Sequence, residues 1–464
     1  MNDDRKEKPP TSRLGRLARL AGLGTKGIPV AAQAARRALA RRSEKKETVE
    51  EAAASRARLT EETKKAAEAM LKTLGEMKGL PLKVGQMLSY IDGVAPPGYE
   101  EKFQETLRKL QDKAPPLSPE AAVRVVTEEL GAPPDDVYAQ WEYEPFAAAS
   151  IGQVHEAVTK GGDRVAVKVQ YPGIDKAIRN DLKSINLFGS MMGPLASKIH
   201  AKEGLEEITE VFLSELDYTR EAEMADLFRR MHEDDPDIVI PRVYQSLSTQ
   251  RVLTSEMLDG QGYSEFIASA DQEARNRTGL AIWRFMFRSL LKYGYLYADP
   301  HPGNYRFLED GRVGFLDFGC VKKLSPELIA GVKRYMSTAM DGDWEAFDRA
   351  CIEVLDYDPE DPTWELYRSY TLELLRPITE DEWQCSPEAA RRAVTFIADG
   401  LKELTFDEAG FPSIPHVPNM PREFTFMNRL QWGLASVMGG IRTRASFAEV
   451  IEPWVRSGVD PIPT

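Results

Sequence analysis

The chain has 464 residues, 42% hydrophobic and 29% charged, which is ordinary for a globular protein and enough for more than one hydrophobic core. Three scattered cysteines are too few for a disulfide framework or a cysteine metal site. The net charge of −13 is uneven, because residues 1–46 hold 13 Lys/Arg against 4 Asp/Glu and carry +9, which leaves −22 on the remainder. An acidic body argues against nucleic acid as a partner of the fold.

The N-terminal residues 1–60 form a basic arm that we expect to be partly disordered. Leu14, Leu17 and Ala18 share one helical face beside several arginines, as in amphipathic helices that lie on anionic membranes. A solvated arm fits the same pattern, so both readings stay open. No stretch reaches the ~18 apolar residues of a spanning helix, and no secretory signal follows Met1. We therefore predict a cytoplasmic, reducing location, with peripheral membrane contact if the arm binds lipid.

Three further segments follow in chain order. Residues 61–135 are predicted to be helical and contain the run LPLKVGQMLSYIDG. Residues 136–258 hold five strand-like runs (WEYEPF, IGQVHEAV, RVAVKVQ, IVIPRVY and RVLTSEML), with a helical stretch to about Met231 before the last two. Residues 259–464 are mainly helical, interrupted by a hairpin around Asp310–Gly311.

Two loops in the last segment carry the clearest chemistry. YADPHPGNY places Asp299 and Asn304 five residues apart, and GFLDFG places Asp317 thirteen residues beyond Asn304. This is the spacing of a kinase catalytic loop followed by its Asp-Phe-Gly element. Phosphoryl transfer from ATP needs a carboxylate near the acceptor and oxygen ligands for Mg²⁺. We therefore predict Asp299 as the catalytic carboxylate and Asn304 and Asp317 as metal ligands.

A lysine in a strand upstream completes this pattern. Lys168, in VAVKVQ, matches the strand lysine that contacts the nucleotide phosphates in kinases. The acidic run EEITEVFLSELDYTREAE then offers Glu215, Asp217 and Glu221. In a regular helix Asp217 and Glu221 share a face and Glu215 lies roughly opposite. Glu221 is therefore the predicted ion-pair partner of Lys168, and both are assigned to catalysis.

The glycine-rich phosphate loop of kinases is replaced by alanines. Ala147, Ala148, Ala149 and Ser150 stand between the first strands. Because each Cβ restricts the backbone and adds bulk, this loop is expected to hold the nucleotide differently from a glycine loop. The predicted nucleotide-binding set consists of these four residues together with Lys168, Glu256 and Met257.

These departures resemble the UbiB/AarF/ADCK family of atypical kinases. The resemblance rests on AAAS followed by SIGQVH, KVGQ, ELD, LQD before Pro115–Pro116, VQYPGI and DPHPGN, and it runs from about residue 65 to 320. It implies an α+β, bilobal protein-kinase-like fold with a helical N-terminal extension across the cleft. Lys83, Gly85 and Gln86 would belong to that extension, which Glu215 and Asp217 would help to seat. Family members often have C-terminal membrane spans, which are not visible here, and IRTRASF replaces the expected apolar run.

The resemblance implies an ATP- and Mg²⁺-dependent kinase or ATPase that supports isoprenoid-quinone or related lipid metabolism, with a lipid or quinone precursor as a further partner. Retention of Asp299, Asn304, Asp317 and Lys168 favours such an enzyme. The occluding extension and the alanine loop favour an alternative, an ATP-gated scaffold with incidental hydrolysis that binds a lipid or a biosynthetic complex. An aminoglycoside-type phosphotransferase shares the spacing of the loops but has no use for KVGQ.

Overall fold

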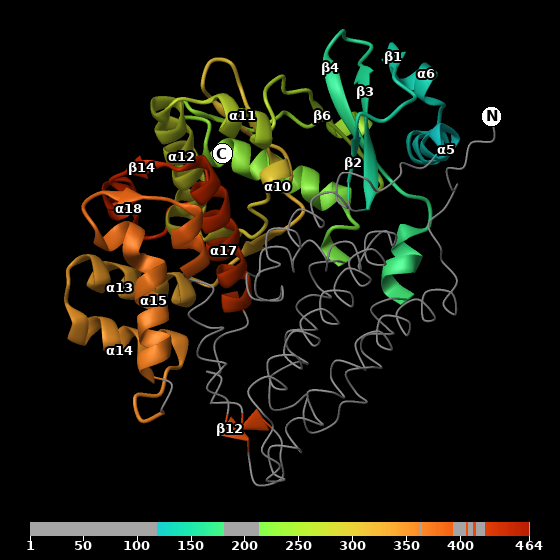
Figure 1. Cartoon of the computed structure of the whole chain (residues 1–464). Helices are drawn as coiled ribbons and strands as arrows, with labels where there is room; N and C mark the ends of the chain where they lie inside the picture. Colours follow the sequence, from blue (N-terminus) through green and yellow to red (C-terminus); the bar gives the residue numbers. More distant parts are fainter. Residues whose placement is uncertain are drawn as a thin grey trace, which may run out of the picture.

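The computed structural model describes residues 118–149, 151–180, 213–361, 364–392, 405–406, 412–413 and 423–463. Helix α5 (Pro119–Leu130) and the short α6 (Pro134–Val137) precede an antiparallel sheet. This sheet contains β1 (Gln140–Trp141), β2 (Ala147–Ala148), β3 (Gly152–Val158), β4 (Arg164–Gln170) and β6 (Val252–Glu256), in the order β1-β3-β4-β6 with β2 also paired to β3. Figure 1 shows α5 beside the sheet, at some distance from the helices of the C-terminal half.

Strand β4 illustrates how the sequence builds this sheet. In RVAVKVQ the valines alternate with other residues, so one face of the strand presents three buried valines to α5. Lys168 lies on the opposite face, between Val154 of β3 and Leu253 of β6. The turn from β3 to β4 relies on Gly162, whose φ of 92° suits glycine.

The acidic run after residue 213 differs from the regular helix considered above. The chain turns at Glu215–Leu216, and α10 (Tyr218–Met231) begins only after Asp217. Asp217 has extended backbone angles, and its carboxylate accepts a hydrogen bond of 3.0 Å from the Thr219 N–H, so it is the N-cap of α10. The helical register that placed Glu215 opposite Glu221 is therefore wrong at this point.

Two of the strand-like runs are also shorter than predicted. In WEYEPF only the first residue lies in β1, and residues 142–146 connect β1 to β2. In IVIPRVY only Ile238–Val239 form a strand, β5, which joins another sheet. Pro241 cannot donate a backbone hydrogen bond, which explains why the strand stops there.

The remaining described residues are mostly helical. Two small sheets carry the predicted loops: β7 (Tyr295–Tyr297) with β10 (Val321–Lys323), and β5 with β9 (Val313–Phe315) and β8 (Tyr305–Phe307). Strands β8 and β9 form the expected hairpin, with Gly311 at φ 85° in its turn. The helices and remaining short elements are η1 (Gln245–Leu247), α11 (Tyr263–Ser269), α12 (Gln272–Phe287), the π-helical turn η2 (Arg288–Lys292), η3 (Pro302–Asn304), α13 (Pro326–Met340), α14 (Trp344–Leu355), α15 (Trp364–Thr379), β11 (Trp383–Gln384), β12 (Thr405–Phe406), β13 (Pro412–Ser413), α17 (Glu423–Ile441), β14 (Arg444–Ala445) and α18 (Phe447–Val455).

One large core holds these helices together. Buried aromatic residues on α10, α12 and the small sheets pack against apolar residues of α13, α14, α17 and α18. The run IRTRASF departs from an apolar segment because it forms β14, which pairs with β11 between α17 and α18. The site described below lies where β4, α10 and the β7–β10 region meet.

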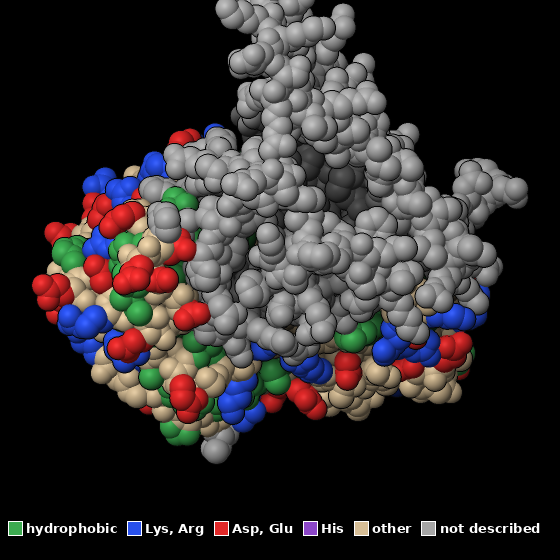
Figure 2. Space-filling view, turned by 90° about the horizontal axis from the view of Figure 1, so that it is seen from below, with side chains coloured by type: hydrophobic (Ala, Val, Ile, Leu, Met, Phe, Trp, Pro, Cys, Tyr) green, Lys and Arg blue, Asp and Glu red, His purple; other side chains and the backbone are tan. Residues whose placement is uncertain are grey.

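Among the described residues, none of the helices combines the length and the hydropathy that a membrane crossing requires. Figure 2 views the molecule from below and shows acidic and basic side chains interspersed over the described part of this face. Many exposed charges of the described residues form ion pairs, such as Arg444 with Glu382 and Arg456 with Asp341. Exposed pairs of this kind each contribute about 0–1 kcal/mol to stability, so the surface does not explain the fold.

Candidate functional site

Lys168 lies at the centre of a cluster of charges. Its Nζ is 2.8 and 3.0 Å from the two carboxylate oxygens of Glu221 and 3.1 Å from Oδ2 of Asp317. The Lys168 side chain is 18% exposed and that of Glu221 only 3%. The fold thus brings Glu221 and Asp317, which are 53 and 149 positions from Lys168 in the sequence, to the same ammonium group. The Lys168–Glu221 pair is the one that the sequence predicted.

Burial and charge act together on this cluster. Burial raises the pKa of Glu221 to about 7, although the ammonium of Lys168 opposes the shift. For Lys168, burial disfavours the charged form, but Asp317 and Glu221 outweigh it and hold its pKa well above the usual value. Lys168 therefore remains positively charged and can bind an anionic ligand.

Tyr218, the first residue of α10, completes the surroundings of Lys168. The ammonium lies 5.0 Å from the centroid of its ring, within the range of a cation–π interaction. Burial raises the pKa of the Tyr218 hydroxyl, so it stays neutral. Tyr218 belongs to none of the predicted site residues, and its only signal in the sequence is its place directly after the Glu-Leu-Asp motif.

The loop that follows β7 is braced by its own hydrogen bonds. The side-chain Nδ2 of Asn304 donates to the backbone oxygen of Asp299 at 2.9 Å, and the His301 N–H donates to the same oxygen at 2.7 Å. His301 Nδ1 accepts the Gly303 N–H at 2.9 Å, and the His301 carbonyl oxygen accepts the Asn304 N–H at 2.9 Å. Asp299 and Asn304 therefore occupy one rigid turn, as their spacing suggested. The bond from Nδ2 does not use the amide oxygen of Asn304.

A backbone hydrogen bond joins this turn to the second predicted loop. The Leu316 N–H donates to the Asn304 carbonyl oxygen at 3.0 Å, immediately before Asp317. Oδ1 of Asp317 accepts the Gly319 N–H at 3.0 Å, while its Oδ2 faces Lys168. Phe318 is buried against Phe228 and Tyr297 and so anchors this loop in the large core.

The residues present fit a magnesium ion. Mg²⁺ uses few protein oxygens and completes its shell with phosphates and waters. One amide oxygen, from Asn304, and one carboxylate, from Asp317, lie on adjoining loops. Within the described ranges, no group of three or more His, Cys, Asp or Glu could form a metal cage of protein ligands alone. This donor set suits an ion that is held jointly with a nucleotide.

Glu215 and Asp217 have different surroundings. Glu215 is buried, and both its Cγ and the Oε2 of Glu221 lie within 4 Å of the position that a Cβ on Gly319 would occupy. Glu215 and Glu221 therefore converge on the same glycine instead of lying on opposite sides. Asp217 faces the start of α10, which it caps. Lys83, Gly85 and Gln86, which the two acids were expected to seat, lie outside the described residues, as does the basic arm.

The alanine loop is part of the sheet. Ala147 and Ala148 pair with Val154 and Gln153, and the Ala149 N–H donates to the Gly152 carbonyl oxygen at 2.8 Å. That N–H is thus already used. Ser150 lies outside the described residues.

Replacement of Ala148 by glycine tests whether this turn covers the phosphates. Glycine removes a Cβ from an exposed position and widens the allowed backbone conformations, which should let the turn approach a nucleotide more closely. We expect ATP or ADP affinity to change by about threefold or more and stability to fall by ~0.5–1 kcal/mol. Calorimetry and thermal unfolding measure the two effects, with Ala147→Gly and Ala149→Gly as matched variants. If nucleotide affinity is unchanged in all three, the turn is not a phosphate cover.

Glu256 and Met257 lie where β6 ends. The Met257 N–H donates to the Arg164 carbonyl oxygen at 3.1 Å, so the sheet already uses it. The side chain of Glu256 is exposed, and its Oε2 accepts the Arg242 N–H at 3.3 Å. The structure does not bring these two residues into contact with the Lys168 cluster, and their role in nucleotide binding stays a prediction.

Comparison with known proteins agrees with this geometry. The chain is 33% identical over 333 residues to "Atypical kinase COQ8B, mitochondrial" of Danio rerio, covering 71% of this chain and 51% of the relative. For the Rattus norvegicus protein of the same name, identity is 33% over 341 residues, covering 73% and 62%. With "Protein ACTIVITY OF BC1 COMPLEX KINASE 1, chloroplastic" of Arabidopsis thaliana it is 35% over 257 residues, covering 53% and 36%. The chain thus spans about half to three fifths of the length of the COQ8B proteins.

A solved structure is similar over most of the chain. It is the complex of Rv3197 with erythromycin from Mycobacterium tuberculosis, with a TM-score of 0.61 and 26% identity, covering 86% of this chain and 98% of that one. A family model described as "ABC1 atypical kinase-like domain" matches residues 109–350, which include Lys168, Glu221, Asp299, Asn304 and Asp317. The chain therefore belongs to the ABC1 atypical kinase-like family, which confirms the resemblance to UbiB/AarF/ADCK proteins that its motifs predicted.

Proposed function

We propose that this protein binds ATP with Mg²⁺ and transfers the terminal phosphoryl group, either to water or to a small or lipid-like acceptor. The observation that carries the proposal is the convergence of Lys168, Glu221 and Asp317, next to the turn that holds Asp299 and Asn304. An ion pair between a strand lysine and a helix glutamate is part of the machinery of protein kinases. Membership of the ABC1 family supports the same reading.

Each residue has a role that follows from its surroundings. Lys168 would place its ammonium on the α- and β-phosphates, and Glu221 would hold that ammonium in position. Asp317 and Asn304 would hold Mg²⁺, which when bound neutralises charge on the phosphates. Asp299 would orient the attacking hydroxyl or water, since its turn is fixed by hydrogen bonds to its own backbone. Pre-organisation of this kind is the main means by which a protein accelerates phosphoryl transfer.

The ion pair between Lys168 and Asp317 must rearrange when nucleotide binds. Lys168 contacts both Asp317 and Glu221. Lys168 would turn to the phosphates and Asp317 to Mg²⁺, so each partner of that pair would gain a new one. Glu221, which is 3% exposed, can remain on Lys168 throughout.

For the acceptor we propose an isoprenoid-quinone precursor or a related lipid. The resemblance to UbiB/AarF/ADCK proteins supports this choice, and the basic arm supports contact with anionic membranes. The names of the matched relatives describe atypical kinases in mitochondria and chloroplasts. They do not name an acceptor.

Phosphate release from ATP by the full chain tests the proposal. We expect turnover with Mg²⁺ and none with a chelator, and stimulation by anionic vesicles relative to neutral ones. Added salt should weaken the stimulation, because screening shortens the reach of the arginines in the arm. Binding of Mg·ATP without any turnover would favour the scaffold alternative. Failure to bind Mg·ATP at all would refute both.

A further inference from the structure

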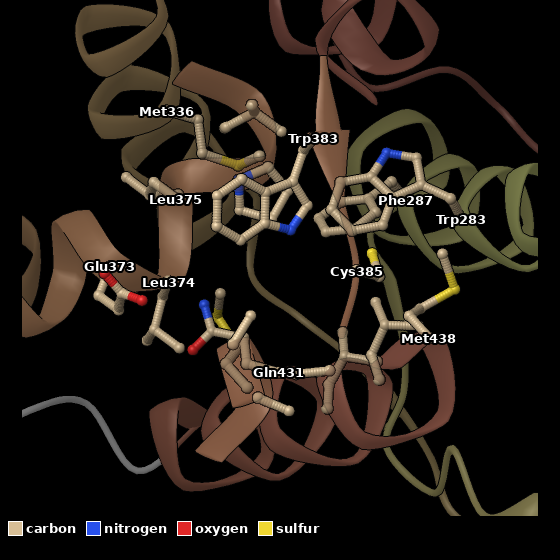
Figure 3. Close-up of a pocket in the computed structure, with 18 of the residues that line it drawn as sticks. Trp283, Phe287, Met336, Glu373, Leu374, Leu375, Trp383, Cys385, Gln431 and Met438 are labelled. Carbon is tan, nitrogen blue, oxygen red and sulfur yellow. The ribbon is translucent and has the colours of Figure 1, made fainter. Parts of the chain in front are cut away.

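A cavity lies among the C-terminal helices, away from the Lys168 cluster. Its volume is about 100 Å³, and helices α12, α13, α15 and α17 contribute its walls together with the segment after β11. Figure 3 shows aromatic and sulfur-containing side chains around its centre. The walls include Trp283, Phe287, Met336, Trp383, Leu434 and Met438.

The walls carry little charge. Glu373 is the one ionisable carboxylate among the lining residues, and it is paired with Arg376 and Arg392. Burial raises the pKa of the Cys385 thiol to about 12, so this thiol is neutral and unreactive at ordinary pH. A charged guest would thus lose its hydration without gaining a counter-ion.

Two side chains bring uncharged polar groups to this apolar space, the Trp383 indole and the Gln431 amide (Figure 3). Trp383 is 91% buried, and Figure 3 shows its indole directed toward the centre of the cavity. Its Nε1–H has no hydrogen-bond acceptor among the described residues, although Arg376 stacks on the ring at 4.5 Å. A guest with an acceptor atom would give this N–H a partner, which is worth about fivefold in affinity.

The same helix that lines the cavity also supports the turn of Asp299. Helix α17 contributes Leu430, Leu434 and Met438 to the walls and packs against β7, directly before that turn. On α17, Gly433 is so close to Pro300 that a Cβ would lie 2.6 Å from the Pro300 Cγ. Because Gly433 and Pro300 are packed without a gap, a shift of α17 would also shift the turn that contains Pro300.

We propose that this cavity binds a small uncharged molecule, with an apolar body about the size of one ring and one hydrogen-bond acceptor, and that its occupancy stabilises the turn of Asp299 through α17. The volume sets an upper limit on the size: about 100 Å³ is less than the ~150 Å³ of an apolar cavity that holds benzene, so the body can be no larger than one ring. The paired Glu373 and the neutral thiol set the charge. The indole N–H of Trp383 sets the acceptor. Neither step requires a bound nucleotide, so the inference stands apart from the proposed function.

Benzene and pyridine form a matched pair of probes, because they have the same shape and differ in one acceptor nitrogen. Their binding to the full chain can be followed by ligand-observed NMR at a pH where pyridine is uncharged. We expect both to bind, and Trp383→Phe to weaken pyridine relative to benzene by about fivefold, the usual effect of one hydrogen bond. Trp344→Phe, at an exposed tryptophan on α14, is the control and should leave the ratio unchanged.

A second pair of variants tests the location and the connection to the turn. Ala435 lines the cavity and Ser436 beside it is exposed, so Ala435→Leu should abolish benzene binding while Ser436→Leu should not. At a free benzene concentration ten times Kd, amide hydrogen exchange in residues 299–304 should slow by about threefold or more. The maximum is roughly tenfold, which would be reached if opening of the turn required complete loss of benzene. The slowing should be absent in Ala435→Leu.

Three results would overturn the proposal. If neither probe binds, another segment of the chain fills the cavity. If Trp383→Phe leaves the ratio of pyridine to benzene affinity unchanged, the indole is not the recognition group. If benzene binds and exchange in residues 299–304 is unaffected, the cavity is not connected to the turn. None of these results depends on whether the protein uses ATP.

Discussion

Asp317→Asn is expected to weaken Mg²⁺-dependent ATP binding by roughly 100-fold, about 2.8 kcal/mol at 1.4 kcal/mol per factor of ten. A carboxylate supplies the negative charge that holds a divalent cation, and an amide of the same shape does not. The side chain is 33% exposed and accepts hydrogen bonds from Lys168 and from the Gly319 N–H. Asparagine keeps one acceptor oxygen, for the Gly319 N–H, and loses the one that faces Lys168. Lys168 still has Glu221 as a partner, so the fold should be preserved.

The measurement is calorimetric titration with ATP in the presence of Mg²⁺ and of a chelator. The variant should bind in both conditions with similar, weak affinity, whereas the unmodified protein should gain from Mg²⁺. Asp310→Asn is the matched control, because Asp310 is an exposed residue of the β8–β9 hairpin whose carboxylate pairs with Arg312. An unchanged response to Mg²⁺ in Asp317→Asn would remove this residue from the metal site.

The placement of the site residues could be read from the sequence because it follows local motifs. Asp299 and Asn304 share one turn, and Asp317 follows a strand joined to that turn by a hairpin, so their spacing alone places them near one another. The Lys168–Glu221 pair needed a further step, from a strand to a distant helix. That step succeeded because Glu221 lies in the first turn of α10, whatever precedes it.

The position of Glu215 could not be read in the same way. Its prediction assumed that one helix continues through EEITEVFLSELDYTREAE, and helix propensity gives no reason for a stop at this point. Asp217 can hydrogen-bond a backbone N–H two residues ahead, which favours a cap over a helix interior. The competition between the two states is decided by packing, since Tyr218 and Leu216 are both buried in the core beside the sheet.

The cavity among the C-terminal helices could not be predicted from the sequence. Its walls come from four helices that are up to 155 residues apart, and Trp283, Leu434 and Met438 look like any other core residues. Tryptophan at 383 carried no motif either. Cavities of this kind arise from how helices fail to fill the space between them, which is a property of the assembled core and not of any local pattern.

Lys168→Met is expected to reduce ATP turnover on the order of 100-fold, the usual effect of losing one group that stabilises charge in the transition state. It should also destabilise the nucleotide-free protein by about 3 kcal/mol, because Glu221 is left buried without its cation. The pKa of Glu221, already raised to about 7, should rise further once the ammonium is gone. Both effects can be measured on one preparation, by phosphate release and by thermal unfolding.

The dependence on pH separates the two effects. A carboxyl whose pKa is raised on folding stabilises the folded state below its unfolded pKa of 4.5, and this contribution is lost as the pH rises through the folded pKa. The Lys168→Met protein should therefore unfold more easily at about pH 8.5 than at about pH 6, relative to the unmodified protein. Adding Glu221→Gln should restore stability and remove this pH dependence, since the glutamine carries no charge. It should not restore turnover, because the phosphates still lack their cation. Recovery of turnover in the double variant would mean that Lys168 acts only by neutralising Glu221, and its role at the phosphates would have to be abandoned.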